Sequence, residues 1–147
     1  MTPSNHAALV RAFIEAAWNA RPTEDLSAFL HPGYADASLP PHFPAGAEGL
    51  RRWIAATGAA FDHHTTIEDL VADERTVAVR LTFRARHIGP WRGIGATGQE
   101  VTVKGFRFFS MQDGRIIGHH ALIDGEALEA ALRGAAHGCA LPRQQNS

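Results

Sequence analysis

The sequence predicts a single α+β domain. In it, three to four helices cover one face of a cone-shaped, curved antiparallel sheet and enclose an apolar pocket. Apolar residues recur at helical spacing through residues 6–61 and then alternate with polar residues from 65 to 123, which is the period of a strand. The pair Asp113-Gly114 predicts a tight hairpin between the last two strands. Helices that precede such a sheet pack together on one of its faces.

The helical half contains three expected helices. Residues 6–20 have the spacing of an amphipathic helix, and Thr23 is suited to cap a second, short helix that ends before His31-Pro32-Gly33. The segment 34–46 is rich in proline and is expected to be irregular. A third helix is expected over residues 46–61, with Leu50, Trp53 and Ile54 on one face.

The second half contains four expected strands. The expected elements are strands at 65–72, 76–87, 101–111 and 115–123, a glycine-rich loop at 88–99, and a last helix that begins at Asp124-Gly125. We expect residues 1–133 to form the domain and residues 134–147 to form a flexible tail.

Composition excludes several classes of function. The 147 residues carry a net charge of -1 and no run of Lys or Arg, so we expect no nucleic-acid partner. No apolar stretch approaches the roughly 20 residues that span a bilayer, so we expect no membrane association. Cys139 is the only cysteine, so no internal disulfide can form and a cytoplasmic location is expected.

Histidine is abundant, and two pairs of neighbouring histidines suggest a metal site. The pairs are His63-His64 and His119-His120. Neighbouring residues on a strand point to opposite faces of the sheet, so neither pair can bind one ion through both rings. We therefore expect no metal ion.

Three polar residues fall on faces that the alternation predicts to be buried. Along 76–87, His87 shares a face with Val77 and its apolar partners. Along 115–124, His120 and Asp124 share a face with Ile116 and Leu122, provided that the strand contains no bulge. Polar groups on a buried face need partners or a purpose, so all three are candidate catalytic residues.

Each candidate also has a purely structural interpretation. Asp124 can cap the last helix, His87 can be half exposed at a strand end, and His120 can be a core histidine bonded to backbone. A buried Asp124 would indicate catalysis, and a solvated one would indicate a cap. The expected pocket walls are aromatic: Trp18, Tyr34, Trp53, Phe83, Trp91, Phe106 and Phe108.

Several segments together resemble the SnoaL-like polyketide cyclases of the nuclear-transport-factor-like superfamily. The resemblance covers most of residues 7–133 and rests on the order and spacing of short motifs. These are Gly46–Leu50, Val71–Arg80, His87-Ile88-Gly89, Ala96–Val101 and Asp113–Ile116 followed by Asp124.

The resemblance implies a cone-shaped fold and cofactor-free ring closure of a polyketide-like substrate. In the family, an aspartate at the position of Asp124 is the general acid/base of an intramolecular aldol reaction, and the histidine that matches His87 lies close by. His120 is the third candidate. The last strand differs from the family, because Gly118 and His120 stand where Glu and Trp are usual. The alternative of a cyclase that acts mainly by folding its substrate, as in a cycloaddition, therefore remains.

One segment resembles a superfamily member with a different function. Tyr34-Ala35-Asp36 weakly resembles a loop of the ketosteroid isomerases, but Pro40-Pro41 occupy the place of the expected base. A non-catalytic small-molecule binding protein is the alternative outside enzymes. We also expect a homodimer through the outer face of the sheet, where Ile117, Ala121 and Ile123 are expected to be exposed.

Overall fold

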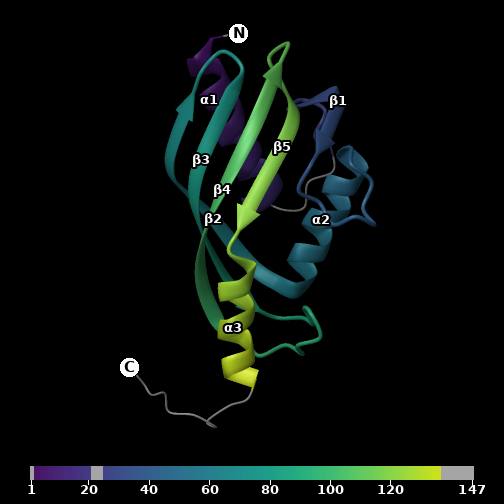
Figure 1. Cartoon of the computed structure of the whole chain (residues 1–147), viewed down its shortest axis with the longest axis vertical. Coiled ribbons are helices and arrows are strands. Elements are labelled where there is room, and N and C mark those ends of the chain that lie inside the picture. The colour runs from purple at the N-terminus through teal and green to yellow at the C-terminus, as the bar shows by residue number, and fades with distance from the viewer. Residues whose placement is uncertain (1, 21–24, 137–147) are drawn as a thin grey trace.

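The protein has the predicted α+β architecture (Figure 1). The structure is a computed structural model that describes residues 2–20 and 25–136. The helical elements are α1 (Pro3–Ile14), the π-helical turn η1 (Glu15–Asn19), α2 (Ala47–Ala60) and α3 (Gly125–Ala136). The strands are β1 (Leu30–Asp36), β2 (Phe61–Ala72), β3 (Thr76–His87), β4 (Glu100–Gln112) and β5 (Arg115–Ile123).

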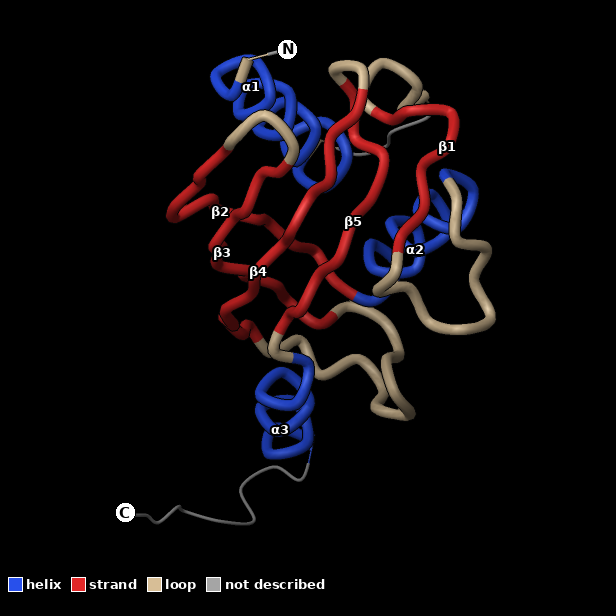
Figure 2. The backbone as a smooth tube through the Cα atoms, turned by 45° about the horizontal axis from the view of Figure 1, so that its top comes forward, coloured by secondary structure: helices blue, strands red, loops and turns tan. Residues whose placement is uncertain are grey.

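The strands form one open, mixed sheet in the order β1-β5-β4-β3-β2 (Figure 2). The pairs within β2–β5 are antiparallel, as predicted, whereas β1 runs parallel to β5. The turn between β4 and β5 has positive φ at both Asp113 and Gly114, which is the geometry of the predicted tight hairpin.

The edge strand β1 replaces a predicted helix and a predicted irregular segment. Residues 23 and 24 of that expected helix lie outside the described residues. Its remainder is a turn, in which Phe29 N and Leu30 N both donate to Leu26 O. Pro32 does not prevent strand formation because an edge strand has only one hydrogen-bonded neighbour.

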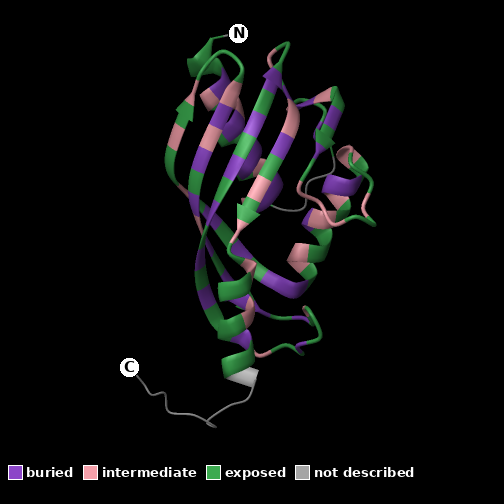
Figure 3. Cartoon of the chain, in the orientation of Figure 1, coloured by how far each residue is buried: buried purple, intermediate pink, exposed green. Residues whose placement is uncertain are grey.

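Helices α1 and α2 cover the inner face of the sheet (Figure 1). Burial alternates along β3 and β4 as predicted (Figure 3). The buried residues of these two strands include Val77, Val79, Leu81, Phe83, Ala85 and His87 on β3, and Val101, Val103, Arg107, Phe109 and Met111 on β4. Arg107 is the charged side chain among them, with only 5% of its surface exposed.

A bulge in β5 reverses its predicted faces. Ser110 pairs with Gly118 while Met111 pairs with Ile116, so Ile117 is an extra residue. Beyond this point His119 is buried and His120 is exposed. The predicted inward position of His120 is therefore wrong, because one inserted residue moves every later side chain to the other face.

The last helix begins at Gly125, as predicted, and extends to Ala136, past the expected domain boundary. The rest of the expected tail, 137–147, lies outside the described residues. Within the described ranges, no helix has the length and apolar character needed to cross a membrane.

Candidate active site

A cavity of about 340 Å³ lies between the inner face of the sheet and α2. Its walls are mainly apolar and aromatic, and four charged or titratable residues line it: Asp36, Arg92, Arg107 and His119. The aromatic walls are Trp18, Trp53, Phe61, Phe83 and Trp91. An apolar cavity in which a few polar groups converge is the usual form of a small-molecule site.

Asp36 and His119 form a buried pair in the wall of this cavity. Nδ1 of His119 lies 2.7 Å from Oδ2 of Asp36. Tyr34 also donates its hydroxyl proton to Oδ2, over 3.1 Å, and the backbone N–H of Ser38 donates to Oδ1 over 2.8 Å. The carboxylate is therefore held by donors on both oxygens, and its position fixes the imidazole ring.

The partners of His119 determine its tautomer. An ionised carboxylate only accepts, so Nδ1 of His119 carries the proton and donates it to Asp36. Nε2 lies 3.3 Å from Nη1 of Arg107, and a guanidinium only donates, so Nε2 accepts. Since 3.3 Å is long for an N–H donor, this second bond is weak, and the Nε2 lone pair is available to a competing group.

Burial sets the charge state of each group. Burial lowers the pKa of His119, and the hydrogen bond to Asp36 opposes this only in part, so the ring is neutral at neutral pH. Burial by itself raises the pKa of Asp36. The hydrogen bonds from His119 and Ser38 outweigh it, so the pKa lies below its ordinary value and the carboxylate is ionised.

The two neighbours of this pair keep their ordinary charges. Burial raises the pKa of the Tyr34 hydroxyl, and the nearby Asp36 charge raises it further, so the phenol stays neutral. Burial lowers the pKa of Arg107 to about 10, so the guanidinium is charged at neutral pH. Its carbon Cζ lies 4.5 Å from the ring centroid of Trp18.

The π-helical turn η1 positions Trp18. Ala20 N donates to Glu15 O over 2.7 Å, the five-residue spacing of a π-helix. Asn19 then fixes the turn to β2, because its side chain accepts from Thr65 N and donates to Thr65 O, over 2.8 and 2.9 Å. The indole is consequently held against Arg107 on the cavity wall.

The predicted catalytic residues lie elsewhere. Asp124 is exposed at the start of α3, where Oδ1 accepts from Ala127 N over 3.0 Å, as a helix cap does. His87 is buried but does not line the cavity. Its Nδ1 lies 3.1 Å from Oγ1 of Thr97 and accepts from Thr97 N over 3.2 Å, so it holds the loop that follows β3.

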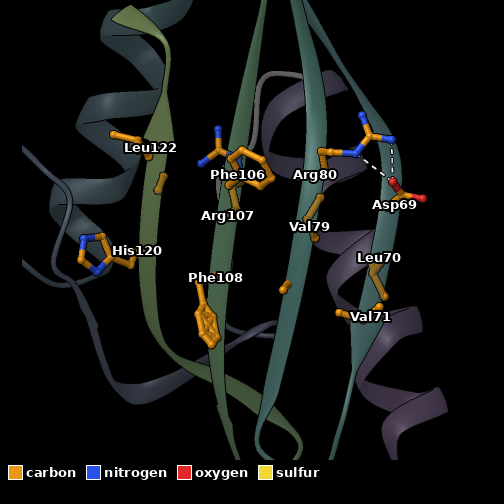
Figure 4. A pocket seen from close by; sticks show the side chains of 12 residues that line it. Asp69, Leu70, Val71, Val79, Arg80, Phe106, Arg107, Phe108, His120 and Leu122 are labelled. Atoms are coloured by element: carbon orange, nitrogen blue, oxygen red, sulfur yellow. Dashed lines mark hydrogen bonds and ion pairs between the residues drawn. The ribbon is translucent and has the colours of Figure 1, made fainter.

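Four of the predicted wall residues, Trp18, Trp53, Phe83 and Trp91, do line the cavity. Tyr34 lies behind Asp36 and does not line it. The expected pocket positions of Phe106 and Phe108 are corrected by the structure: alternation along β4 turns both outward. They lie there in a groove of about 540 Å³ together with His120 and Leu122 (Figure 4).

The sequence interpretation missed the three residues that converge on the cavity. Arg107 had a visible signal, because it shares the parity of Val103 and Phe109 and is therefore a charge on an apolar face. Asp36 had only the weak Tyr34-Ala35-Asp36 resemblance, in a segment expected to be irregular. His119 had none, since the bulge that turns it inward has no signature in the sequence.

The fold and cavity together define a small α+β protein with a buried acid–base pair in an aromatic pocket. Residues 8–132 match the model of the SnoaL-like polyketide cyclases. The chain therefore belongs to the SnoaL-like polyketide cyclase family.

Two enzymes and one solved structure illustrate the relationship. The chain is 28% identical over 115 residues to the aklanonic acid methyl ester cyclase DnrD of Streptomyces peucetius, covering 76% of this chain and 79% of that one. It is 28% identical over 120 residues to the aklanonic acid methyl ester cyclase AcmA of Streptomyces galilaeus, covering 80% of this chain and 81% of that one. The structure of TsrD from Streptomyces laurentii superposes with a TM-score of 0.78 at 28% identity, covering 90% and 97%.

Proposed function

We propose that this protein is an enzyme that closes a ring in a polyketide-derived intermediate by cofactor-free general acid–base catalysis, with His119 as the acid–base group. The observation that supports this role is the buried Asp36–His119 pair at the cavity wall. The names of DnrD and AcmA, both ring-closing enzymes, support the reaction class. The proposal assigns to His119 the role that the family resemblance suggested for Asp124.

The reaction is an intramolecular aldol closure. Neutral His119 removes a proton through Nε2 from a carbon beside a carbonyl, and the resulting enolate carbon attacks a second carbonyl of the same molecule. A carbon–carbon bond forms, and the electron pair of that carbonyl moves to its oxygen. The imidazolium then returns the proton to this alkoxide through Nε2, so the product is an isomer of the substrate and no co-reactant is consumed.

Asp36 acts as a positioning residue in this scheme. It holds Nδ1–H of His119 over 2.7 Å, which directs Nε2 away from Asp36 and stabilises the imidazolium formed during the reaction. The aromatic walls contribute the other part of catalysis, because holding a flexible chain in the folded geometry gives an intramolecular reaction much of its advantage.

Turnover of aklanonic acid methyl ester, the substrate in the names of both relatives, tests the proposal. We expect His119→Gln to lower kcat on the order of a hundredfold, the usual contribution of a positioned general base. His120→Gln is the matched control, because His120 is the next residue but faces the outer groove. Equal turnover by His119→Gln and the wild type would mean that the cavity acts by folding its substrate.

We also propose that the protein forms a homodimer through the outer face of the sheet. Of the residues first expected to form this face, Ile123 instead lines the cavity, and Ala121 lines both the cavity and the outer groove. The exposed apolar side chains of the outer groove are Val71, Phe106, Phe108 and Leu122. Leu122 is 74% exposed, and such a continuous apolar groove is typical of an interface between subunits.

A further inference from the structure

Arg107 is a buried cation that no carboxylate of the described residues contacts. It is 5% exposed and lies on the inner face of β4, at the wall of the cavity. No ion pair within 4.0 Å joins it to an acidic group in residues 2–20 and 25–136, because His119 separates it from Asp36. The charge of Asp36, beyond His119, raises the pKa of Arg107 but does not offset the lowering by burial. A buried charge without a directly bound counterion is unfavourable, so its presence at a cavity wall indicates that a ligand supplies this partner.

The hydrogen bonds of Arg107 also indicate that a ligand binds there. A guanidinium has five N–H donors. Within the described part of the chain, its side chain makes one hydrogen bond, from Nη1 to Nε2 of His119, and its flat face is covered by the Trp18 ring. N–H groups along the edge of the guanidinium therefore remain available to an acceptor in the cavity.

The other cation at this cavity is compensated. Arg92 lies 3.0 Å from Glu129, and its side chain is half exposed. A ligand anion therefore gains more from Arg107 than from Arg92, because the interaction at Arg107 is shielded from water and no carboxylate of the described residues forms an ion pair with Arg107.

We propose that Arg107 binds the two oxygens of a 1,3-dicarbonyl group, so that the substrates of this enzyme are compounds with a carbon acid between two carbonyls. Guanidinium recognises planar pairs of anionic oxygens through two parallel N–H donors. When the carbon of a 1,3-dicarbonyl loses its proton, the charge spreads over both oxygens, which then form such a pair.

The geometry places this group beside the base. Nη1 of Arg107 and Nε2 of His119 are 3.3 Å apart, so an oxygen bound at Nη1 brings the carbon next to its carbonyl to Nε2. The substrate then replaces the weak bond between Arg107 and His119. This inference rests on the proposed function for the reaction itself, but it concerns binding and is measured without turnover.

Binding of three probes tests the proposal in the intact protein. The probes are the anion of 4,4,4-trifluoro-1-phenylbutane-1,3-dione, an acyclic dione whose two oxygens can lie side by side, its 2,2-dimethyl derivative, which cannot ionise, and 4-phenylbenzoate, a carboxylate. The three tryptophans of the chain, Trp18, Trp53 and Trp91, all line the cavity, so quenching of their fluorescence reports occupancy. We expect the dione anion to bind at least about tenfold more tightly than the 2,2-dimethyl derivative.

Substitution of Arg107 should remove this preference. In Arg107→Gln we expect the dione anion and the 2,2-dimethyl derivative to bind equally, whereas Arg86→Gln, at an exposed position paired with Asp62, should keep the wild-type ratio. An unchanged ratio in Arg107→Gln overturns the proposal. Tighter binding of 4-phenylbenzoate than of the dione anion overturns the assignment to 1,3-dicarbonyl compounds.

One measurement needs no variant, which matters if Arg107→Gln does not fold. The ultraviolet absorption of the dione changes on ionisation, so its pKa can be titrated while it is bound to the wild-type protein. An available cation lowers the pKa of a bound acid, whereas an apolar cavity alone raises it. We expect the bound dione to have a lower pKa than the free one, and a raised pKa overturns the proposal. Loss of turnover in His119→Gln is independent of this result.

Discussion

Asp36 and His119 face each other across neighbouring parallel strands, although they are 83 positions apart in the sequence. A backbone hydrogen bond joins the same two segments, from Ala37 N to His119 O over 2.9 Å. The pair therefore depends on two local irregularities, the docking of the edge strand β1 and the bulge in β5. The Asp36–His119 pair therefore requires β1 to be docked against the bulged strand β5.

The buried His119 should make stability depend on pH in a defined window. Its folded-state pKa lies below the ordinary 6.5, so between these two values the unfolded chain binds more protons and stability falls as the pH decreases below about 6.5. Each unit of lowering corresponds to ~1.4 kcal/mol. When the pH decreases from about 7 to about 5, we expect the Tm of His119→Gln to fall less than the Tm of the wild type.

The controls for this measurement are internal. His120→Gln should keep the wild-type dependence, since His120 is exposed. Asp36 does not contribute in this window, because a carboxylate with a lowered pKa loses its stabilising effect only as the pH falls below the ordinary value of 3.8. Parallel Tm curves for the wild type and His119→Gln would show that His119 is not buried as a neutral ring.

The parts of the fold that follow from regular periodicity were predictable. The strand at 76–87 and the hairpin at Asp113-Gly114 have the predicted bounds and turn, because alternation and turn residues determine them locally. Strand β1 was not predictable in this way: a short edge strand that contains Pro32 and Gly33 forms because β5 offers an unpaired edge. Local preference at those positions gives no indication of it.

The candidate site was less predictable, because it too depends on contacts that local sequence does not determine. Four aromatic walls were identified, since alternation and helical spacing place large apolar side chains on the inner face. The alternation predicted that His120 points inward and His119 outward. The reverse is observed because a single bulged residue, Ile117, reverses the faces of the strand. Asp36 depends on a contact between segments far apart in the sequence, which no local pattern encodes.

Asp124 allows the catalytic and capping interpretations to be separated. Its carboxylate caps α3, so Asp124→Ala should cost ~1 kcal/mol of stability, whereas Asp124→Asn retains a capping oxygen and should cost little. We expect both variants to keep wild-type turnover, because the side chain is exposed and outside the cavity. A hundredfold loss in Asp124→Asn with an unchanged Tm would restore the assignment made from the family resemblance.

The outer groove should determine the oligomeric state. A charge at Leu122, as in Leu122→Asp, should convert a dimer into a monomer at micromolar concentration, as measured by light scattering, because a buried unpaired charge is costly at an interface. Ile88→Asp is the control, since Ile88 is 49% exposed but lies outside the groove. A wild-type protein that is monomeric at that concentration contradicts the proposed interface.

The pH dependence of kcat/KM should report the neutral form of His119. A general base must be unprotonated, so activity falls as the pH decreases through its pKa. Burial lowers this pKa below 6.5, so we expect a plateau from about pH 6.5 upward and an acid limb below it. An acid limb above pH 6.5 would indicate another base.

Asp36→Asn should change both parts of this profile. The hydrogen bond and charge of Asp36 raise the pKa of His119, so their removal lowers it and moves the acid limb to lower pH. The plateau should also fall, on the order of a hundredfold, because an amide no longer fixes the proton on Nδ1 or stabilises the imidazolium. The control is Asp62→Asn, an exposed aspartate on β2 paired with Arg86, which should leave both plateau and limb unchanged. A lower plateau without a shift of the limb would mean that Asp36 supports the cavity structurally and does not act through His119.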